Sequence, residues 1–260
     1  MVTILTSIFF ILGLIIGSFL NVVILRFNTE RSLGGRSGCM SCMHKLSWCE
    51  LIPVLSFLGL RGRCRNCKAK ISIQYPIVEL ISGFIFAALF VKFQNIFFYN
   101  TVPVFVFTYV FYVTAFSILL VIAAYDMRHK IIPDTLSLAL GILAFIGLFF
   151  FNDSGFYPHI PSIIELSSGF LIAAPFAFFW LVSSGRWMGL GDAKLAIGLG
   201  WLLGISLALS GVVIAFWIGA AVGVTLIIFS KKYGMKSAIP FAPYLVLGTM
   251  LAFLFDIHLF

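Results

Sequence analysis

Charged side chains are scarce in this chain of 260 residues. Asp, Glu, Lys and Arg make up 10% of it, and only nine residues are acidic. A water-soluble domain has roughly a quarter of its residues charged, so this composition excludes one. In contrast, 62% of the residues are hydrophobic and 30 are Phe. Because a bilayer-spanning helix needs about 20 apolar residues, the recurring long apolar runs predict a polytopic membrane protein.

The basic residues predict the orientation. A net charge of +8 would suit a nucleic-acid partner, but the distribution of the charge does not require one. The first apolar run, at 4–25, has no Lys or Arg before it and meets Arg26 directly after it. This order indicates an uncleaved anchor with its N-terminus outside, followed by a cytosolic loop. Further spans are expected at 77–91, 104–124, 136–151, 163–183, 195–209, 212–230 and 241–255.

These runs predict an all-α polytopic membrane protein of about eight transmembrane helices, with both termini outside. Every Lys and Arg except Lys92 then lies in a cytosolic loop, so the positive-inside rule accounts for the charge and no nucleic-acid partner is expected. We expect three parts: a first transmembrane helix at 1–26, a small cytosolic insert at 27–75 and a transmembrane core at 76–260. Membrane lipid is an expected partner.

All five cysteines lie in the expected insert. Cys39 with Cys42 and Cys64 with Cys67 form two CxxC pairs, a pattern typical of a zinc ribbon. Structural disulfides are rare in the cytosol, so a metal is favoured over two disulfides, with zinc ahead of iron or a redox dithiol. Four thiolates close the coordination shell, which predicts a structural metal. Cys49 has no partner.

Two acidic residues stand out because charge is costly within a span. Asp126 ends the third expected span, and Asp192 opens the sixth within a Gly-Leu-Gly-Asp string. Both are expected at the cytosolic boundary at the same depth, where two carboxylates that meet can perform aspartic-protease chemistry. The alternative is that Asp126 pairs with Arg128 or Lys130 while Asp192 caps its helix.

Other polar residues near the expected cytosolic boundary have no assigned chemical role. Asp134 follows Pro133 near a helix start, where capping is expected. Glu79 lies early in the second span and should make a polar contact within the bundle. Asn21 and Ser18 could form hydrogen bonds between helices or line a site. The remaining acids are expected to be solvated: Glu30, Glu50, Asp153, Glu165 and Asp256.

Several short strings follow one another along nearly the whole chain. They are Gly-Ser-Phe-Leu-Asn-Val at 17–22, the two CxxC pairs, Tyr-Pro-Ile-Val-Glu at 75–79, Asp126 with Ile-Pro-Asp at 132–134, Gly-Leu-Gly-Asp-Ala-Lys at 189–194 and Ile-Pro-Phe at 239–241. Taken together, these strings resemble the type IV prepilin peptidase family. Three residues depart from the usual family pattern: Met40, Gln74 and Ala242.

The resemblance implies a membrane aspartic endopeptidase of the bacterial cytoplasmic membrane. Such an enzyme removes the basic leader of type IV prepilins or type II secretion pseudopilins at the cytosolic face. The family's catalytic pair maps onto Asp126 and Asp192. Many members also methylate the new N-terminal amine with S-adenosylmethionine, and their cysteine-bearing loop is associated with that activity. No glycine-rich Rossmann fingerprint is present, so no residue is assigned to the methyl donor.

Two functions of other classes compete with this reading. An ion-coupled secondary transporter could use the intramembrane carboxylates, but transporters usually place these groups near the bilayer midplane within internal repeats. Here the acids lie at helix ends and no repeat is evident. Alternatively, the chain could be a membrane-tethered zinc-ribbon adaptor, for which loss of the cysteine insert would abolish the main function.

Overall fold

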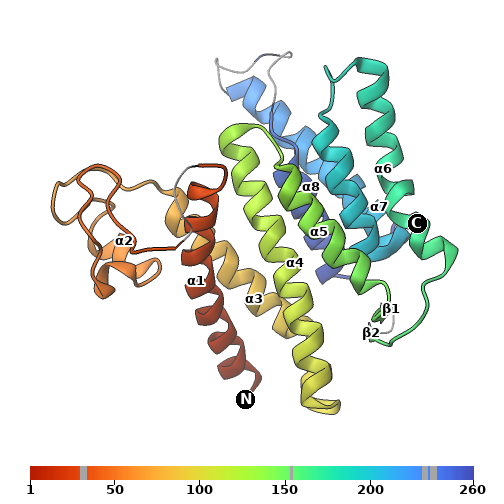
Figure 1. Ribbon diagram of the computed structural model, residues 1–260, viewed down its shortest axis with the longest axis horizontal. Helices are drawn as coiled ribbons and strands as arrows, with labels where there is room; N and C mark the ends of the chain where they lie inside the picture. The colour runs from red at the N-terminus through yellow and green to blue at the C-terminus, as the bar shows by residue number, and fades with distance from the viewer. Residues whose placement is uncertain (30–33, 153–154, 230–233, 235–238) are drawn as a thin grey trace. The chain divides into compact units, whose positions relative to one another are not determined.

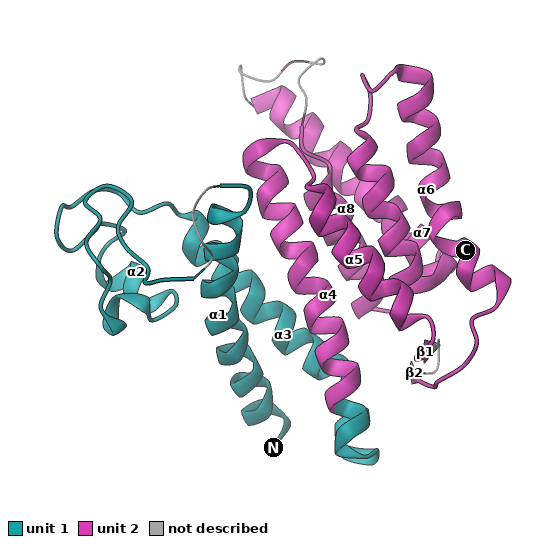
Figure 2. Cartoon of the chain, in the orientation of Figure 1, with its two compact units in different colours: residues 1–105 teal, residues 106–260 magenta. Residues whose placement is uncertain are grey.

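The structure is a computed structural model that describes residues 1–29, 34–152, 155–229, 234 and 239–260. The chain divides into two compact units, 1–105 and 106–260 (Figure 2). The boundaries expected from the sequence at 26/27 and 75/76 stay a prediction. Some residues used above for topology or as solvated acids lie outside the described part: Glu30, Arg31, Asp153, Ser230, Lys231, Lys232 and Lys236.

The first unit is built on a pair of long helices, α1 and α3, that pack against each other (Figure 1). A Cβ atom added at Gly17 of α1 would lie 2.8 Å from the Cα atom of Glu79, so only glycine allows this close approach. In the sequence, a short 3-10 helix, η1, and a single-turn helix, α2, come between α1 and α3. The bounds are α1 Val2–Arg26, η1 Trp48–Leu51, α2 Leu55–Gly59 and α3 Gln74–Tyr99.

The second unit is organised around α7, which packs against α5, α6 and α8. A two-residue antiparallel hairpin, β1 with β2, follows α5. The sequence had predicted that this fourth span would continue to 151, but the helix ends at Gly147 and Phe151 begins the hairpin. The bounds are α4 Val102–His129, α5 Asp134–Gly147, β1 Phe151–Asn152, β2 Gly155–Phe156, α6 Ile163–Ser183, α7 Leu190–Phe229 and α8 Ala242–Leu254.

Five helices among the described residues are long and apolar enough to cross a membrane: α1, α3, α4, α6 and α7. Helices α5 and α8 are apolar but shorter. Helix α7 is interrupted at Gly204, whose φ of 73° is outside the helical range. The sequence had placed this break at Ser210-Gly211, which is wrong, because both residues are buried within the second half of α7. With α7 counted as two helices, every predicted apolar run forms a helix, and the all-α polytopic fold is confirmed.

The first half of α7 is held tightly against α6. A Cβ atom added at Gly200 would lie 2.7 Å from the Cα atom of Gly169, so the two backbones touch. The Ser168 hydroxyl donates a hydrogen bond to the Gly200 carbonyl at 2.9 Å, and the Trp201 ring donates to the Leu166 carbonyl at 2.9 Å. Small residues and hydrogen bonds between helices are the usual means of packing helices in a membrane, where burial of apolar surface gives little driving force.

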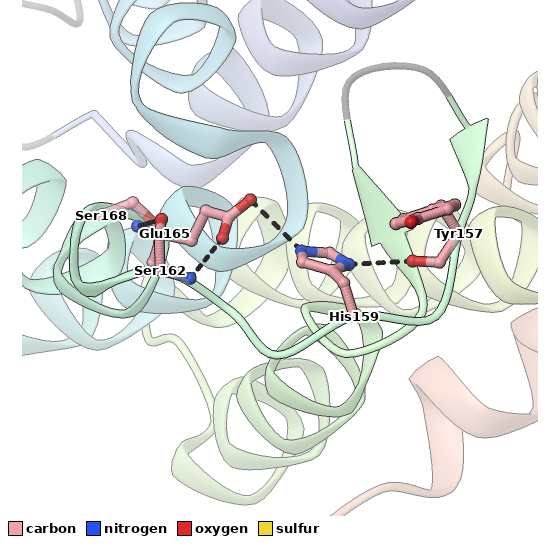
Figure 3. Close-up of polar contacts among 5 residues, drawn as sticks. All are labelled: Tyr157, His159, Ser162, Glu165 and Ser168. Atoms are coloured by element: carbon pink, nitrogen blue, oxygen red, sulfur yellow. Dashed lines mark hydrogen bonds and ion pairs between the residues drawn. The ribbon is translucent and has the colours of Figure 1, made fainter.

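A polar cluster closes the N-terminal end of α6 (Figure 3). The Glu165 carboxylate accepts the Ser162 N–H at 2.6 Å, while the Ser162 hydroxyl accepts the Glu165 N–H, which completes a capping box. His159 lies 3.4 Å from the same carboxylate and 2.8 Å from the Tyr157 carbonyl. Glu165, expected to be a solvated group, therefore has a structural role at the start of α6.

The Gly200 contact gives a stability prediction. Gly200→Ala should lower the unfolding temperature of the protein in detergent, because overpacking a tight interface costs about 1–3 kcal/mol. Gly141→Ala on α5 is the matched control: a Cβ atom there meets no atom within 4 Å, so stability should be unchanged or slightly higher. Equal unfolding temperatures for Gly200→Ala and the unsubstituted protein would contradict the packing described above.

Candidate active site and metal centre

Asp126 is a buried carboxylate at the end of α4. Its Oδ2 atom accepts the backbone N–H of Ala242 at 3.2 Å. Ala242 is the first residue of α8, so this N–H is one of those that a helix leaves without a partner at its N-terminus. The positive end of the helix dipole also favours a negative group at this position. Helix α8 thus supplies both a donor and a favourable field to Asp126.

Aromatic contacts hold the start of α8 in place. The Phe241 ring, next to Ala242, lies 4.9 Å from the Phe216 ring of α7. Further along α8, Phe253 stacks on Tyr112 of α4 with ring centroids 4.7 Å apart. These contacts tie α8 to the two helices that carry the candidate aspartates. The sequence reasoning treated residue 242 only as a departure from a family string, and nothing local in the sequence indicates that its N–H binds Asp126.

Asp192 is the second buried acid of this unit and lies in the first turn of α7. It is 8% exposed, against 4% for Asp126. The Asp126 carboxylate is close enough to interact electrostatically with Asp192. The two acids, far apart in the sequence, are thus brought into one buried site by α4 and α7. The Asp126 carboxylate accepts the Ala242 N–H, and the alternative pairing with Arg128 or Lys130 stays a prediction.

The glycines before Asp192 allow two segments to touch. A Cβ atom added at Gly191 would lie 3.0 Å from the Cβ atom of Ile132, in the connection between α4 and α5. A Cβ atom at Gly189 would lie 3.6 Å from the Asp192 Oδ2 atom. A side chain at Gly191 would therefore crowd the connection, whereas one at Gly189 would meet the carboxylate at an ordinary contact distance. The Gly-Leu-Gly-Asp string and the Ile-Pro-Asp string meet through this contact.

Asp134 forms an ion pair with Lys194, with 2.8 Å between Oδ1 and Nζ. The pair connects the first turns of α5 and α7, and both side chains are exposed. The expectation that Asp134 caps its helix is wrong, because Pro133 is the N-cap residue and Asp134 is the first residue of the helix. Asp134 is thus a solvent-accessible acid of the same unit, unlike the buried Asp126 and Asp192.

The polar residues of the first unit connect its helices to the insert. Glu79 is buried and accepts the Val54 N–H at 2.8 Å, together with a hydrogen bond from the Ser18 side chain. The Asn21 side chain donates to the Tyr75 carbonyl at 3.0 Å. The expected polar contact of Glu79 is therefore present. Its link to the insert had no signal in the sequence, because the two partners are 25 residues apart.

The four paired cysteines form one cluster in the first unit. The sulfur atoms of Cys39, Cys42, Cys64 and Cys67 all lie within 4.8 Å of one another, and all five cysteines are free thiols. Cys39 Sγ and Cys67 Sγ are 3.8 Å apart. A tetrahedral site with zinc–sulfur bonds of about 2.3 Å has sulfur–sulfur separations of about 3.8 Å. The donor set therefore fits zinc, whose coordination shell it would close.

The two cysteine turns share one backbone pattern. The Cys39 N–H donates to the His44 carbonyl and the Cys64 N–H donates to the Ala69 carbonyl, both at 2.9 Å. Each turn also has a residue with positive φ four positions after its first cysteine, Met43 in one and Lys68 in the other. This structural repeat was missed in the sequence, because the two turns have little in common besides their cysteines.

The electrostatics of the first turn favour metal binding. Backbone N–H groups of Cys42 and Ser41 lower the pKa of the Cys39 thiol to about 6. The thiolate is the form that coordinates metal, so Cys39 favours the ligand state at neutral pH. Cys67 differs: the Ala69 N–H lowers the pKa of its thiol, but hydrogen bonds with the other cysteines of the cluster raise it to about 11.

The fold and the site together define a class of protein. It is a multi-pass membrane protein with two buried aspartates at the ends of two spanning helices and a separate four-cysteine insert. Buried carboxylate pairs of this kind are typical of aspartic peptidases.

Comparisons with known proteins agree with that class. Residues 11–93 match the family model of the bacterial peptidase A24 N-terminal domain, and residues 113–224 match that of the type IV leader peptidase family. The chain belongs to the type IV leader peptidase family. No solved structure matches it significantly.

Curated relatives carry the name prepilin leader peptidase/N-methyltransferase. One from Bacillus subtilis is 31% identical, covering 96% of this chain and 94% of its own length. One from Aeromonas hydrophila is 31% identical, covering 95% and 90%. One from Myxococcus xanthus is 35% identical over 88% of this chain, which spans only 65% of that longer relative. None of these findings supports the transporter alternative.

The cysteine cluster gives a metal-content prediction. The purified protein should carry about one zinc per chain by elemental analysis, and Cys64→Ser should lose most of it because three thiolates bind zinc more weakly. Cys49→Ser should keep the full content, since Cys49 is exposed and outside the cluster. Less than about half an equivalent in protein prepared without chelators would count against the site.

Proposed function

We propose that this chain is a prepilin peptidase that removes the leader from type IV prepilins or pseudopilins, with Asp126 and Asp192 as its catalytic pair. The observation that carries the proposal is the burial of these two aspartates together in the second unit, within electrostatic reach of each other. The family membership and the names of the relatives support the same reaction. The chain is thus an aspartic endopeptidase that acts within or beside a membrane.

The two acids take different roles in the proposed mechanism. Asp126 accepts the Ala242 N–H at the N-terminus of α8, an environment that suits a negative group, so it is assigned as the general base. The two carboxyl groups together hold one proton, which lies on Asp192. Asp192 donates this proton to the oxygen of the scissile carbonyl as a water molecule attacks the carbonyl carbon. Asp126 takes a proton from that water, and the tetrahedral intermediate then collapses as the leaving amine is protonated.

Placement at helix ends suits a substrate that remains in the membrane. Peptide groups within lipid must be hydrogen-bonded internally, so a helix cannot readily be opened for cleavage there. A catalytic pair at the membrane boundary can meet an extended peptide next to an apolar helix. The distribution of Lys and Arg supports the cytosolic side of a bacterial cytoplasmic membrane, with both termini outside.

We also propose a second activity, N-methylation of the new N-terminus with S-adenosylmethionine as methyl donor. The names of the relatives support this activity. The four cysteines would hold a structural zinc that orders the insert, and a closed tetrathiolate shell leaves no position for a substrate. The residues that bind the methyl donor are not assigned. We keep the proposed division of the chain into a first transmembrane helix at 1–26, a cytosolic insert at 27–75 and a transmembrane core at 76–260.

Replacing either catalytic aspartate should abolish peptidase activity. Asp126→Asn and Asp192→Asn retain the shape of the side chain but lose its acid-base function, so each should reduce leader cleavage by about 1,000-fold or more. The assay is cleavage of a full-length prepilin in proteoliposomes, read by mass of the product N-terminus.

Asp134→Asn is the matched control for this experiment. Asp134 is an exposed acid in the same unit, and exposed ion pairs contribute about 0–1 kcal/mol, so activity should stay within a few-fold of the unsubstituted enzyme. Full activity of both Asp126→Asn and Asp192→Asn would refute the proposed catalytic pair.

A further inference from the structure

The insert exposes a group of large apolar side chains that we call the apolar strip: Trp48, Leu51, Ile52, Leu55 and Leu58. Trp48 is 77% exposed, Leu55 67% and Leu58 64%. The strip lies on η1, on α2 and in the connection between them, and the two helices contact each other. Single exposed apolar residues are ordinary, but five of them within residues 48–58 of a polar segment indicate an interaction surface.

A hydrogen bond fixes the strip near the membrane boundary. Val54, between Ile52 and Leu55, donates its N–H to Glu79 at 2.8 Å. Glu79 lies five residues inside α3, which at 1.5 Å per residue is about 7.5 Å from the helix start. The polar headgroup region is about 5–7 Å thick on each side of the hydrocarbon core. The strip is thus tied to α3 about 7.5 Å from its start, close to residue 77, where the sequence predicts that the span begins.

The backbone of Val54 adopts a conformation that a β-branched residue disfavours. Its φ of 61° is rare for a β-branched residue, and such strain persists only where surrounding contacts impose it. The buried Glu79 carboxylate supplies that contact. The insert also enters and leaves through spanning helices, since α1 ends at Arg26 and α3 begins at Gln74. Both ends of the insert therefore remain at the membrane.

Charge identifies the surface that the strip meets. Among the described residues of the insert, Glu50 is the one acidic side chain, and its carboxylate is engaged by the N–H and hydroxyl of Ser47. Exposed basic residues flank the strip in the sequence on both sides. Juxtamembrane Lys and Arg are attracted to anionic lipid headgroups by about 1 kcal/mol each. These basic residues are Lys45, Arg61, Arg63, Arg65, Lys68 and Lys70.

We propose that the insert docks on the anionic lipid surface of the bilayer that α1 and α3 span. The apolar strip enters the interfacial layer, where Trp is favoured, and the basic residues contact lipid phosphates. Glu79 holds the strip against α3 through the Val54 N–H. This docking is independent of the proposed peptidase reaction.

Hydrogen exchange on the full-length protein tests the proposal. In nanodiscs with about one third phosphatidylglycerol, amides at 48–58 should exchange several-fold more slowly than in pure phosphatidylcholine nanodiscs. Leu55→Glu with Leu58→Glu should remove this difference, because two carboxylates are expelled from an anionic interface. Metal content near that of the unsubstituted protein will establish that the variant insert is folded.

Met43→Glu is the control with the same kind of chemical change. Met43 is an exposed apolar residue of the insert outside the strip, and the equivalent position of the second cysteine turn is Lys68, so a long polar side chain fits there. This variant should keep most of the lipid-dependent protection. Protection that is equal in both lipids and survives the double substitution would mean that protein covers the strip. That result, or free exchange of 48–58 in both lipids, would overturn the proposal.

Discussion

Burying two carboxylates among apolar helices is the constraint on which the second unit depends. A charged group removed from water is costly unless hydrogen bonds and nearby dipoles replace the lost solvation. The N-terminus of α8 does this for Asp126 through the Ala242 N–H. That arrangement requires α8 to begin at one definite place, which the contact of Phe241 with Phe216 secures. Aromatic packing beside Ala242 thus serves the chemistry of the acids.

A comparable compensation holds the first unit together. Glu79 is buried in α3, and its partners are a backbone N–H of the insert and the Ser18 side chain of α1. Two helices and the intervening insert are therefore linked through one carboxylate. The four-cysteine cluster fixes the other part of the insert by bringing two equivalent turns together. In each unit, hydrogen bonds from neighbouring segments stabilise a buried carboxylate.

Much of this could be predicted from the sequence, because charge is rare enough to be conspicuous in a membrane protein. Asp126 and Asp192 were both expected at helix ends at the same depth in the membrane, which suggested that they meet. The CxxC spacing indicated one four-cysteine site. Contacts between distant residues could not be inferred in this way. The Ala242 bond to Asp126 joins residues 116 positions apart, and it uses a backbone group that carries no sequence signal.

The error at the break in α7 has a similar physical origin. Ser210-Gly211 resembles a turn, but in a membrane helix such small residues serve packing: the Ser210 hydroxyl donates to the Ser206 carbonyl, and a Cβ atom at Gly211 would lie 2.8 Å from Thr249 Cα. Gly204 has the positive φ and bears the interruption instead. Composition alone does not separate these two uses of glycine.

The central claim is that Asp126 and Asp192 act as one catalytic unit, and a double-mutant cycle tests it most directly. The value of kcat/KM for a full-length prepilin would be measured for the unsubstituted enzyme, the two single Asn variants and the double variant. Residues that act as a unit have strongly non-additive effects. The account predicts that the double variant is about as inactive as either single one. Independent losses that multiply in the double variant would contradict it.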